Sequence, residues 1–397
     1  MKKFNFKYIA TIVSMVAILS LTSALAMPQG KGVLLTDNQG RILYTKNPDT
    51  PLVPASILKL ITSLAAIEYL GEDFRFQTQV QYLPHTQNLY IKGLGDPLFT
   101  SEAIDKLAQT IAKKVKHVKH IFLDSSFFAP DIKIPGTGRS LNPYDATTGA
   151  LCANFNTVAF QWDNARQRFI SAEPQTPLLF NFFKKEIESS NLKKGRILLS
   201  SPQQRKYPGY LIQFFLKKHG INCTGEIKTG RLNKSAGTTW EIASPYTLTE
   251  ILQKLLYYSN NFIANQLVLT MGASKNAPPA TLKKSQQILN LFAKKTLGLK
   301  DFKIVEGSGL SRNNRISPAQ MGKVLMSFLA HHRLLRMDNG EYYKTGTLSG
   351  VKTRAGFICG RDKKLYPFVV MLNQQTKGYT KIMKALKQKV RSYEMDH

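Results

Sequence analysis

Residues 53–71 read VPASILKLITSLAAIEYLG, an apolar run that carries a serine and a lysine close to its start. Pro54 is typical of the first turn of a helix, and Gly71 is typical of the position that follows the last turn. The apolar residues between them leave hardly any polar stripe, which predicts a helix buried in the core. Because residues three positions apart lie on one helix face, we expect Ser56 and Lys59 to be neighbours.

A serine beside a buried lysine has a chemical use. A serine hydroxyl is a weak nucleophile until a base removes its proton. Lysine titrates near 10.4 in water, so a lysine base that works at neutral pH needs its pKa lowered by roughly 3 units. Burial and a second cation both lower the pKa of a lysine. We therefore predict that Ser56 is a nucleophile and that Lys59 is its general base.

Two later motifs can complete such a site, which needs a proton route to the leaving amine, donors for the oxyanion and a cation for an acidic substrate. Ser259-Asn260-Asn261 lies at the junction of two predicted helices, where a hydroxyl and an amide can point into one cleft. Lys344-Thr345-Gly346-Thr347 lies on a predicted strand. Gly346 has no side chain, so a substrate can lie along the strand edge, and Lys344 supplies the charge.

Each motif also occurs elsewhere in this lysine-rich chain. The S-x-x-K spacing recurs at Ser190 and Ser349, S-x-N recurs at Ser189, and a second K-T-G begins at Lys228. Ser189 has no flanking apolar helices, Ser190 lies in a polar stretch, and no paired hairpin follows Lys228. Context rather than spacing therefore favours the three motifs described first.

The order of the predicted elements brings both ends of the chain into one sheet. Residues 32–47 read as a hairpin with its turn at residues 38–40. Three more strands are predicted near the end of the chain, at residues 341–350, 355–360 and 366–373. The final helix, residues 381–395, has an apolar face that we expect to pack on this sheet rather than on a membrane.

We therefore predict an α+β protein with an antiparallel five-stranded sheet flanked by helices. This catalytic domain would be discontinuous, formed by residues 27–72 and 241–397. Residues 73–240, in which short strands alternate with turns and a few helices, would be a large inserted α/β region that selects the substrate.

The first 26 residues predict an export signal. Lys2, Lys3 and Lys7 precede the apolar run IATIVSMVAILSL, and Ala24-Leu25-Ala26 fits a cleavage site. An uncleaved membrane anchor is the alternative, since the apolar run is near the length that spans a bilayer. We expect cleavage after Ala26 and a soluble protein in the periplasm.

The formal charge of +30 at pH 7 favours an anionic neighbour. Nucleic acid is not expected, because an exported protein rarely meets it and no recognition motif is present. The carboxylates of peptidoglycan peptides and anionic membrane lipids remain as candidates. Cys152, Cys223 and Cys359 leave a disulfide between the first two open, and their spacing fits no zinc site, so no metal or other cofactor is expected.

The three motifs together resemble those of the D-alanyl-D-alanine carboxypeptidase/endopeptidase family, the class C low-molecular-mass penicillin-binding proteins. The chain departs from the family pattern at Leu94, which interrupts the glycines before Asp96, and at Glu306, where aspartate is usual. Class A β-lactamases are disfavoured, because Ser56 and Ser259 are too widely separated. The matching stretches are PASILKL, GLGDP, FLDSSFF, NPYDATTGALCANFNTVAF, YYSNNFIANQL, VEGSGLSRNNRISP and KTGTLSGVKTRAGFICG.

The resemblance implies a penicillin-binding, β-lactamase-like transpeptidase domain and a role for each motif residue. Ser56 would attack the carbonyl between the two terminal D-alanines of a peptidoglycan stem peptide, with Lys59 as base, and water would hydrolyse the acyl-enzyme. Ser259 would pass the proton to the departing amine. Asn261 would hold the substrate amide and fix Lys59.

Substrate binding is implied for the remaining positions. Lys344, with the Thr345 and Thr347 hydroxyls, would bind the terminal carboxylate. The backbone N–H groups of Ser56 and Thr347 would form the oxyanion hole. Asp124, in LDSSFF, matches an aspartate with which the family's inserted domain helps to read the diaminopimelate side chain; a carboxylate that caps a strand end is the alternative.

We therefore expect a periplasmic serine D-Ala-D-Ala carboxypeptidase, a DD-endopeptidase, or both, which β-lactams acylate at Ser56. Two other functions stay open at this point: a non-hydrolytic peptidoglycan-binding scaffold with a closed cleft, and a β-lactamase-like hydrolase. The balance of carboxypeptidase and endopeptidase activity, the oligomeric state and the strength of any contact with anionic lipids are also open.

Overall fold

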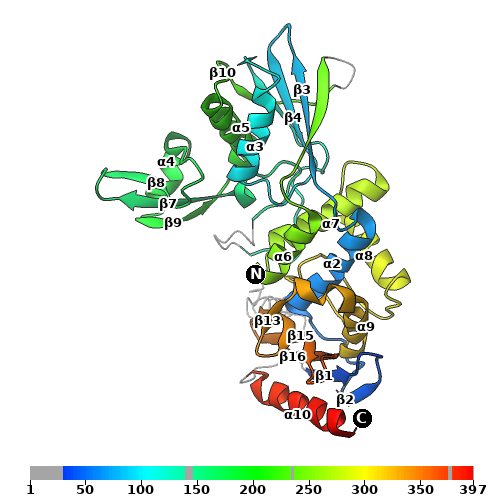
Figure 1. The fold of residues 1–397 in the computed structure, drawn as a ribbon. Helices are drawn as coiled ribbons and strands as arrows, with labels where there is room; N and C mark the ends of the chain where they lie inside the picture. Colours follow the sequence, from blue (N-terminus) through cyan, green and yellow to red (C-terminus); the bar gives the residue numbers. More distant parts are fainter. Residues whose placement is uncertain (1–29, 139–145, 234–236, 374–377, 397) are drawn as a thin grey trace, which may run out of the picture.

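The computed structural model describes residues 30–138, 146–233, 237–373 and 378–396. The predicted export signal, residues 1–26, lies outside the described residues. None of the helices in the described ranges is long and apolar enough to cross a membrane. The chain forms two bodies, each built on its own sheet, and Figure 1 shows them at opposite ends of an elongated molecule.

The first body is built on one antiparallel sheet with the strand order β13-β14-β15-β16-β1-β2. The five predicted strands are all present, two from the start of the chain and three from its end. The expected count of five is nevertheless wrong, because a three-residue strand, too short to show alternation, adds a sixth at the edge. The strands are β1 (Gly30–Thr36), β2 (Ile42–Lys46), β13 (Arg336–Asp338), β14 (Glu341–Leu348), β15 (Val351–Cys359) and β16 (Leu365–Asn373).

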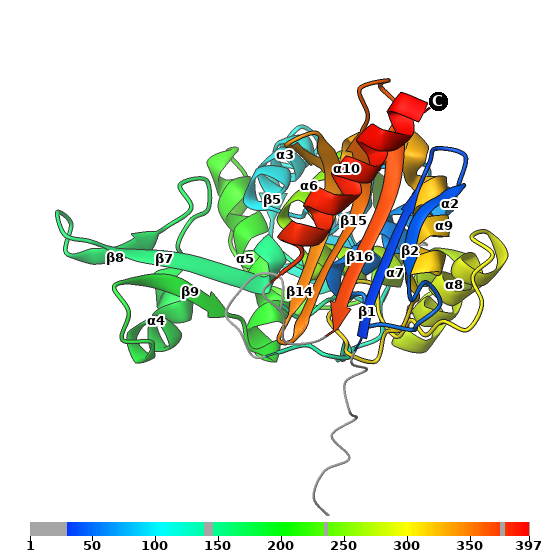
Figure 2. The same cartoon turned by 90° about the horizontal axis from the view of Figure 1, so that it is seen from below.

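Helices cover both faces of this sheet (Figure 2). Because neighbouring residues of a strand point to opposite faces, Val33 and Leu35 join one apolar cluster and Leu34 joins another. The first cluster includes Met383 and Leu386 of α10 (Thr380–Asp396), so the prediction that the last helix packs on the sheet is confirmed. The second cluster joins the other face to the remaining helices of this body: α2 (Lys59–Leu70), α6 (Leu248–Tyr258), α7 (Asn261–Asn276), α8 (Leu282–Lys295) and α9 (Pro318–Phe328).

Helix α2 is the buried helix that the sequence predicted. Each of its first eight residues, from Lys59 to Ala66, is buried. The segment before it differs from the expectation of one continuous helix, since Ala55–Leu58 form a 3₁₀ turn, η1, and α2 begins at Lys59. In a 3₁₀ turn, residues three positions apart are eclipsed, so the expected pairing of Ser56 with Lys59 holds.

The second body contains a mixed five-stranded sheet with the order β11-β6-β4-β3-β12. Helices α3 (Ser101–Ala112) and α5 (Ser201–Lys218) pack with this sheet in a separate apolar core. Strand β12 pairs with β3 along its whole length. The predicted end of the inserted region, residue 240, therefore lies inside a strand of this sheet. The sheet strands are β3 (Gln77–Leu83), β4 (Asn88–Gly93), β6 (Ile121–Asp124), β11 (Ile227–Thr229) and β12 (Thr238–Ala243), beside the short parallel pair β5 (His117–Val118) and β10 (Asn222–Cys223).

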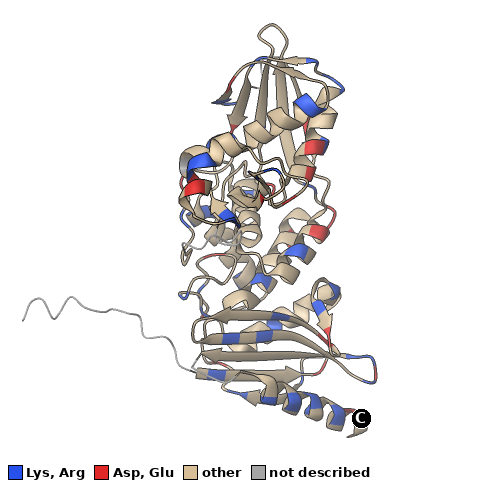
Figure 3. Ribbon diagram, turned by 90° about the vertical axis from the view of Figure 1, so that its left-hand side faces the viewer, with Lys and Arg blue, Asp and Glu red and all other residues tan. Residues whose placement is uncertain are grey.

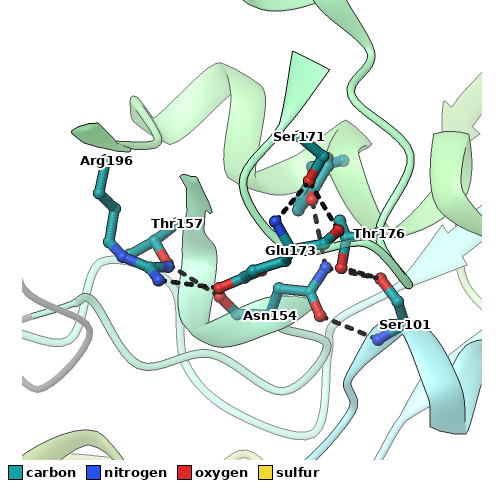
Figure 4. Close-up of polar contacts among 8 residues, drawn as sticks. Ser101, Asn154, Thr157, Ser171, Glu173, Thr176 and Arg196 are labelled. Carbon is teal, nitrogen blue, oxygen red and sulfur yellow. Dashed lines mark hydrogen bonds and ion pairs between the residues drawn. The ribbon is translucent and has the colours of Figure 1, made fainter. Parts of the chain in front are cut away.

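A three-stranded arm extends from the second body (Figure 2). Figure 4 shows the polar network at its base, where the Asn154 amide exchanges hydrogen bonds with the backbone N–H and the hydroxyl of Ser101, each 2.9 Å long. Arg196 donates to Thr157 Oγ1 (2.7 Å) and pairs with Glu173 (2.8 Å). The arm consists of β7 (Thr157–Asp163), β8 (Arg168–Ser171), α4 (Phe180–Ser189) and β9 (Lys194–Leu198), after the 3₁₀ turn η3 (Asn154–Asn156).

All three cysteines are free thiols. Cys152 and Cys223 are both buried, and the disulfide that the sequence left open between them is not formed.

Candidate active site

The sheet holds the segment before Ser56 in a fixed position. Asn373 of β16 accepts a hydrogen bond from Val53 N (2.6 Å) and donates one to Val53 O (3.1 Å). Thr353 of β15 donates to the carbonyl of Pro54 (2.7 Å). Ala55 has φ of +49°, a left-handed conformation that is unfavourable for alanine. The strained turn is therefore held by two strands, and it leaves Ser56 partly exposed at the start of the buried helix.

Lys59 is the central group of the cluster, and its side chain is completely buried. Its Nζ lies 2.7 Å from Asn261 Oδ1, 2.7 Å from the carbonyl of Ser308 and 3.0 Å from Ser56 Oγ. A neutral amine has two N–H donors and one lone pair. If the two carbonyl oxygens accept the two N–H groups, the lone pair is left for the hydroxyl proton of Ser56.

Electrostatics favour this neutral form. Burial lowers the pKa of Lys59 well below its usual value, and the positive charge of Lys344 lowers it further. The carboxylate of Glu306 partly opposes both effects. The arrangement can therefore supply an uncharged base beside a hydroxyl, as the sequence predicted from the apolar character of the helix.

The second motif lies where α6 ends and α7 begins. Ser259 caps α6 in a left-handed conformation, with φ of +55°, and its hydroxyl is partly exposed. Asn260 caps α7 through a hydrogen bond from Ile263 N (3.0 Å). Asn261, the first residue of α7, is buried and contacts Lys59. The sharp turn between the helices therefore brings the Ser259 hydroxyl and the Asn261 amide to the same cluster.

The third motif lies on β14 and contacts both of the others. Lys344 Nζ lies 2.7 Å from Ser259 Oγ and 2.8 Å from the carbonyl of Thr345. A Cβ at Gly346 would lie 2.6 Å from the backbone nitrogen of Ser56, so only glycine allows this close approach. Thr347 is exposed beside it. Burial lowers the pKa of Lys344 to about 7.

The loop of residues 306–314 completes the cluster, and its role was missed in the sequence. The buried carboxylate of Glu306 accepts hydrogen bonds from Ser308 N (2.7 Å), Ser311 N (3.2 Å) and Asn314 Nδ2 (2.8 Å). These bonds hold the Ser308 carbonyl against Lys59. The family resemblance had marked this stretch, but a backbone carbonyl has no side-chain signature by which its function could be recognised.

The structure brings eight of the nine candidate residues into this cluster and leaves one outside it. Asp124 ends β6 in the second body and is almost completely buried. Its carboxylate accepts hydrogen bonds from Ser126 N (2.8 Å) and Leu232 N (2.9 Å), which is the geometry of a strand-end cap. Asp124 also lines a cavity of about 440 Å³ with Phe128 and Arg231.

The alternative motif copies do not form a second such cluster. Lys228, which begins the other K-T-G, lies on β11 and pairs with Glu226 at 3.3 Å. Ser190 follows α4 and donates to the carbonyl of Ile187 (2.6 Å). Within the described part of the chain, no group of three or more histidine, cysteine, aspartate or glutamate residues is placed to bind a metal.

Comparisons with known proteins agree with this geometry. The profile of the D-Ala-D-Ala carboxypeptidase 3 (S13) family matches residues 20–191 and 161–339. The D-alanyl-D-alanine carboxypeptidase of Actinomadura sp. (strain R39) is 26% identical over 415 residues, which cover 84% of this chain and 76% of that protein.

Two solved structures share the fold. Penicillin-binding protein 4 of Haemophilus influenzae has a TM-score of 0.70 at 20% sequence identity, covering 88% of this chain and 91% of that one. A predatory peptidoglycan endopeptidase of Bdellovibrio bacteriovorus has a TM-score of 0.53 at 16% identity, covering 90% of both chains. The similarity extends over both bodies of the molecule.

Proposed function

Because the chain belongs to the D-Ala-D-Ala carboxypeptidase 3 (S13) family, we propose that the cluster around Ser56 is the site at which it hydrolyses D-alanyl peptide bonds of peptidoglycan. The comparisons confirm the family and the serine carboxypeptidase or endopeptidase activity that the sequence predicted. The assignment of the chemistry to particular residues rests on one observation above all: the buried Lys59 amine lies 3.0 Å from Ser56 Oγ.

In the proposed acylation step, neutral Lys59 takes the proton of Ser56 as Oγ attacks the carbonyl of the penultimate D-alanine. Ser259 donates its hydroxyl proton to the departing amine as the C–N bond breaks, and Lys59 passes the proton it took from Ser56 to Ser259, which restores the hydroxyl and the neutral amine. Lys344, whose Nζ lies 2.7 Å from Ser259 Oγ, stabilises the hydroxyl oxygen while this transfer takes place. Water then attacks the ester on Ser56 while neutral Lys59 takes a proton from the water, and Lys59 returns this proton to Ser56 Oγ as the acyl–oxygen bond breaks.

Binding of the substrate is assigned to β14. The strand edge beyond Gly346 is proposed to accept the peptide backbone, as a glycine at the point of closest approach allows. The terminal carboxylate of the leaving residue would bind Lys344 and the hydroxyls of Thr345 and Thr347. The backbone N–H groups of Ser56 and Thr347 would stabilise the oxyanion, and the contact between Gly346 and Ser56 supports their convergence.

The inserted region, placed at residues 73–240 between the two parts of a catalytic domain formed by 27–72 and 241–397, is proposed to select the substrate. Asp124 is its candidate recognition residue, since it lines a cavity beside Arg231. Its two hydrogen bonds to backbone N–H groups mean that Asp124→Ala would also disturb the loop after β6. Asp124→Asn keeps one acceptor oxygen and is the cleaner test of recognition.

Export and contact with a membrane surface are also proposals. A cell-wall substrate and the predicted leader support a periplasmic location. Helix α10 exposes a row of cations (Figure 3), among them Lys381, Lys384, Lys389 and Arg391. These could bind anionic lipid headgroups. Co-sedimentation with phosphatidylglycerol vesicles, but not with phosphatidylcholine vesicles, is expected; equal sedimentation with both would contradict the lipid contact.

Mass spectrometry of digested muropeptides tests the proposed function. We expect purified protein to remove one D-alanine from pentapeptides, to cleave D-alanyl–diaminopimelate cross-links, or to do both. Ser56→Ala should abolish every such product, whereas Ser190→Ala, at the matched S-x-x-K spacing in the three-stranded arm, should leave them unchanged. Intact muropeptides after digestion would instead indicate a non-hydrolytic binder, and rapid turnover of β-lactams would indicate a β-lactamase-like hydrolase.

A further inference from the structure

The pairing of β14 defines the direction in which the chain of a bound substrate would continue. The edge strand β13 pairs only with the first part of β14, and the last pair before the motif is Arg336 with Tyr343. From Lys344 onward, no strand among the described residues pairs with β14 on that side. A peptide that lies along this free edge would therefore be collinear with β13, and its end at Lys344 would point towards Arg336.

A hollow of about 360 Å³ lies at this end of the edge, and we call it the α6–β13 hollow. One wall is the last turn of α6, which ends at Tyr258, directly before Ser259. The other wall is η4 (Leu329–Leu334) with the start of β13. The lining residues include Lys254, Tyr257 and Tyr258 of α6 and Arg333 and Arg336 of the opposite wall.

Exposed aromatic rings and cations lie side by side around this hollow. Tyr257 is 61% exposed and Tyr258 is 69% exposed, and their rings contact each other edge to face. Lys254, Arg333 and Arg336 also line the hollow. The charge of Lys254 helps to lower the pKa of Glu250, one turn earlier on α6, and its Nζ lies 5.7 Å from the centre of the Tyr246 ring. No carboxylate of the described residues lies within ion-pair distance of the two arginines. Exposed aromatic rings beside an excess of cations suit a ligand that combines carboxylates with apolar stems.

The direction of the substrate identifies this ligand. In the function proposed above, on which this inference rests, the carboxylate of the leaving residue lies at Lys344. A carboxypeptidase substrate ends there, with a single D-alanine. In a D-alanyl–diaminopimelate cross-link, the leaving amine belongs to a second stem peptide, which continues past Lys344 and carries further carboxylates.

We propose that the α6–β13 hollow binds the leaving stem peptide of a cross-linked substrate. Arg336 and Lys254 attract its carboxylates from opposite walls, and the ring of Tyr258 packs against its aliphatic carbons. The hollow makes no contact with a pentapeptide that loses only D-alanine. Its residues therefore set the preference for endopeptidase over carboxypeptidase action rather than the chemistry itself.

The test compares two purified substrates, a monomeric pentapeptide and a cross-linked muropeptide dimer. In Lys254→Ala/Arg336→Ala and in Tyr258→Ala, the ratio of kcat/KM for the dimer to that for the pentapeptide should fall at least tenfold, mainly through KM for the dimer. Lys283→Ala removes an exposed cation from α8, outside the hollow, and should leave the ratio unchanged. Each preparation is normalised to the fraction that fluorescent penicillin labels, so misfolded protein does not count.

Three results would overturn the inference: an unchanged ratio in the hollow variants, an equal loss on both substrates, or a wild-type protein that hydrolyses the pentapeptide but not the dimer. A wild-type protein that hydrolyses neither substrate would overturn the proposed function, and the inference with it. The two failures are thus distinguished by the pentapeptide reaction.

Discussion

At the scale of single residues, the proposed chemistry depends on the three partners of one nitrogen, Lys59 Nζ. Lys59 Nζ has three oxygen neighbours, and only one of them, Ser56 Oγ, carries a proton that it can give up. The other two are carbonyl oxygens of Asn261 and Ser308. This division of one lone pair and two N–H groups explains why the cluster needs an amide at position 261.

A charge at position 261 should therefore disable the base. In Asn261→Asp, a carboxylate 2.7 Å from Lys59 Nζ would stabilise the ammonium form and raise the pKa of Lys59. We expect acylation by penicillin at pH 7 to slow at least tenfold, and its rate to recover at higher pH. Asn260→Asp, whose side chain only caps α7, is the matched control and should acylate at the wild-type rate. Equal pH profiles for both variants would contradict the role of Asn261.

The charge of Lys344 gives a second pH dependence. Lys344 is protonated below its pKa of about 7 and neutral above it, so its attraction for a substrate carboxylate is present at lower pH and lost as the pH rises. We expect kcat/KM for D-Ala-D-Ala peptides to fall on the alkaline side near pH 7. Arginine stays charged throughout this range, so Lys344→Arg should lack this alkaline limb whatever its absolute rate. If kcat/KM of Lys344→Arg falls near pH 7 as in the wild type, a group other than Lys344 causes the fall.

The sequence could predict the motif side chains at this scale, because their types and the apolar context of Ser56 are visible in the letters. It could not predict the Ser308 carbonyl or the hydrogen bonds of Glu306, since a backbone oxygen acquires its role only when the chain folds. For Asp124 the sequence offered two readings, and the hydrogen bonds to Ser126 and Leu232 fit the strand-end cap.

At the scale of elements, two glycines hold the nucleophile in place. Gly346 of β14 approaches the backbone of Ser56 on one side, and Gly309 of the 306–314 loop approaches the carbonyl of Ala55 on the other. Gly309 has φ of +82°, and a Cβ there would lie 1.8 Å from the oxygen of Ala55. The loop is therefore a wall of the site as well as the source of the Ser308 carbonyl.

Gly309→Ala should displace the Ser56 turn. Left-handed backbone costs about 1–2 kcal/mol for alanine, and the collision with Ala55 adds to this. Gly298→Ala, with φ of +61° and open space around its Cβ position, carries the backbone cost alone. We expect both variants to lose some thermal stability but only Gly309→Ala to lose most of its acylation rate. Equal acylation rates in the two variants would show that the loop does not position Ser56.

Elements with strong local signals could be predicted, among them the first hairpin, the three late strands and the buried helix. The strand β13 could not be predicted, because three residues are too few to show a periodicity. Its extended conformation follows from its pairing with β14. The 3₁₀ turn before α2 was also missed, since it depends on Thr353 and Asn373 from strands about 300 residues away.

At the scale of the whole molecule, a buried carboxylate lies where the two bodies join. Asp96 follows β4 and accepts a hydrogen bond from Leu98 N (2.8 Å), and the hydroxyl of Ser244, after β12, interacts with it. Ser244 N also donates to the carbonyl of Phe76, before β3 (2.7 Å). Burial raises the pKa of Asp96 to about 6, so its charge at neutral pH opposes folding.

The sign of this effect can be tested. Because the pKa of Asp96 is about 6 in the folded protein and near 3.9 in the unfolded chain, the folded state binds more protons between these values. The stability that comes with protonated Asp96 is therefore fully present below about pH 4 and is lost as the pH rises through about 6. Asp96→Asn should raise the free energy of unfolding by up to about 3 kcal/mol at pH 7.5 and leave it nearly unchanged at pH 4. A less stable variant at pH 7.5 would show that the charge itself holds the junction.

The two-body arrangement could be foreseen only in outline. Strands β3, β4 and β12 come from both ends of the inserted stretch, and their pairing is a tertiary event that no local pattern encodes. The presence of an inserted α/β region followed from a change in the character of the sequence. The order of its strands and the presence of the arm at residues 157–198 could not be predicted from this change.

The most direct test of the central claim is to find which atom a penicillin acylates. The protein is incubated with penicillin, digested, and the modified peptide is mapped by mass spectrometry in wild type and in Ser56→Ala. We expect one equivalent of penicilloyl ester on Ser56 and none on the variant. A label on any other serine, or a variant that still labels, would contradict it.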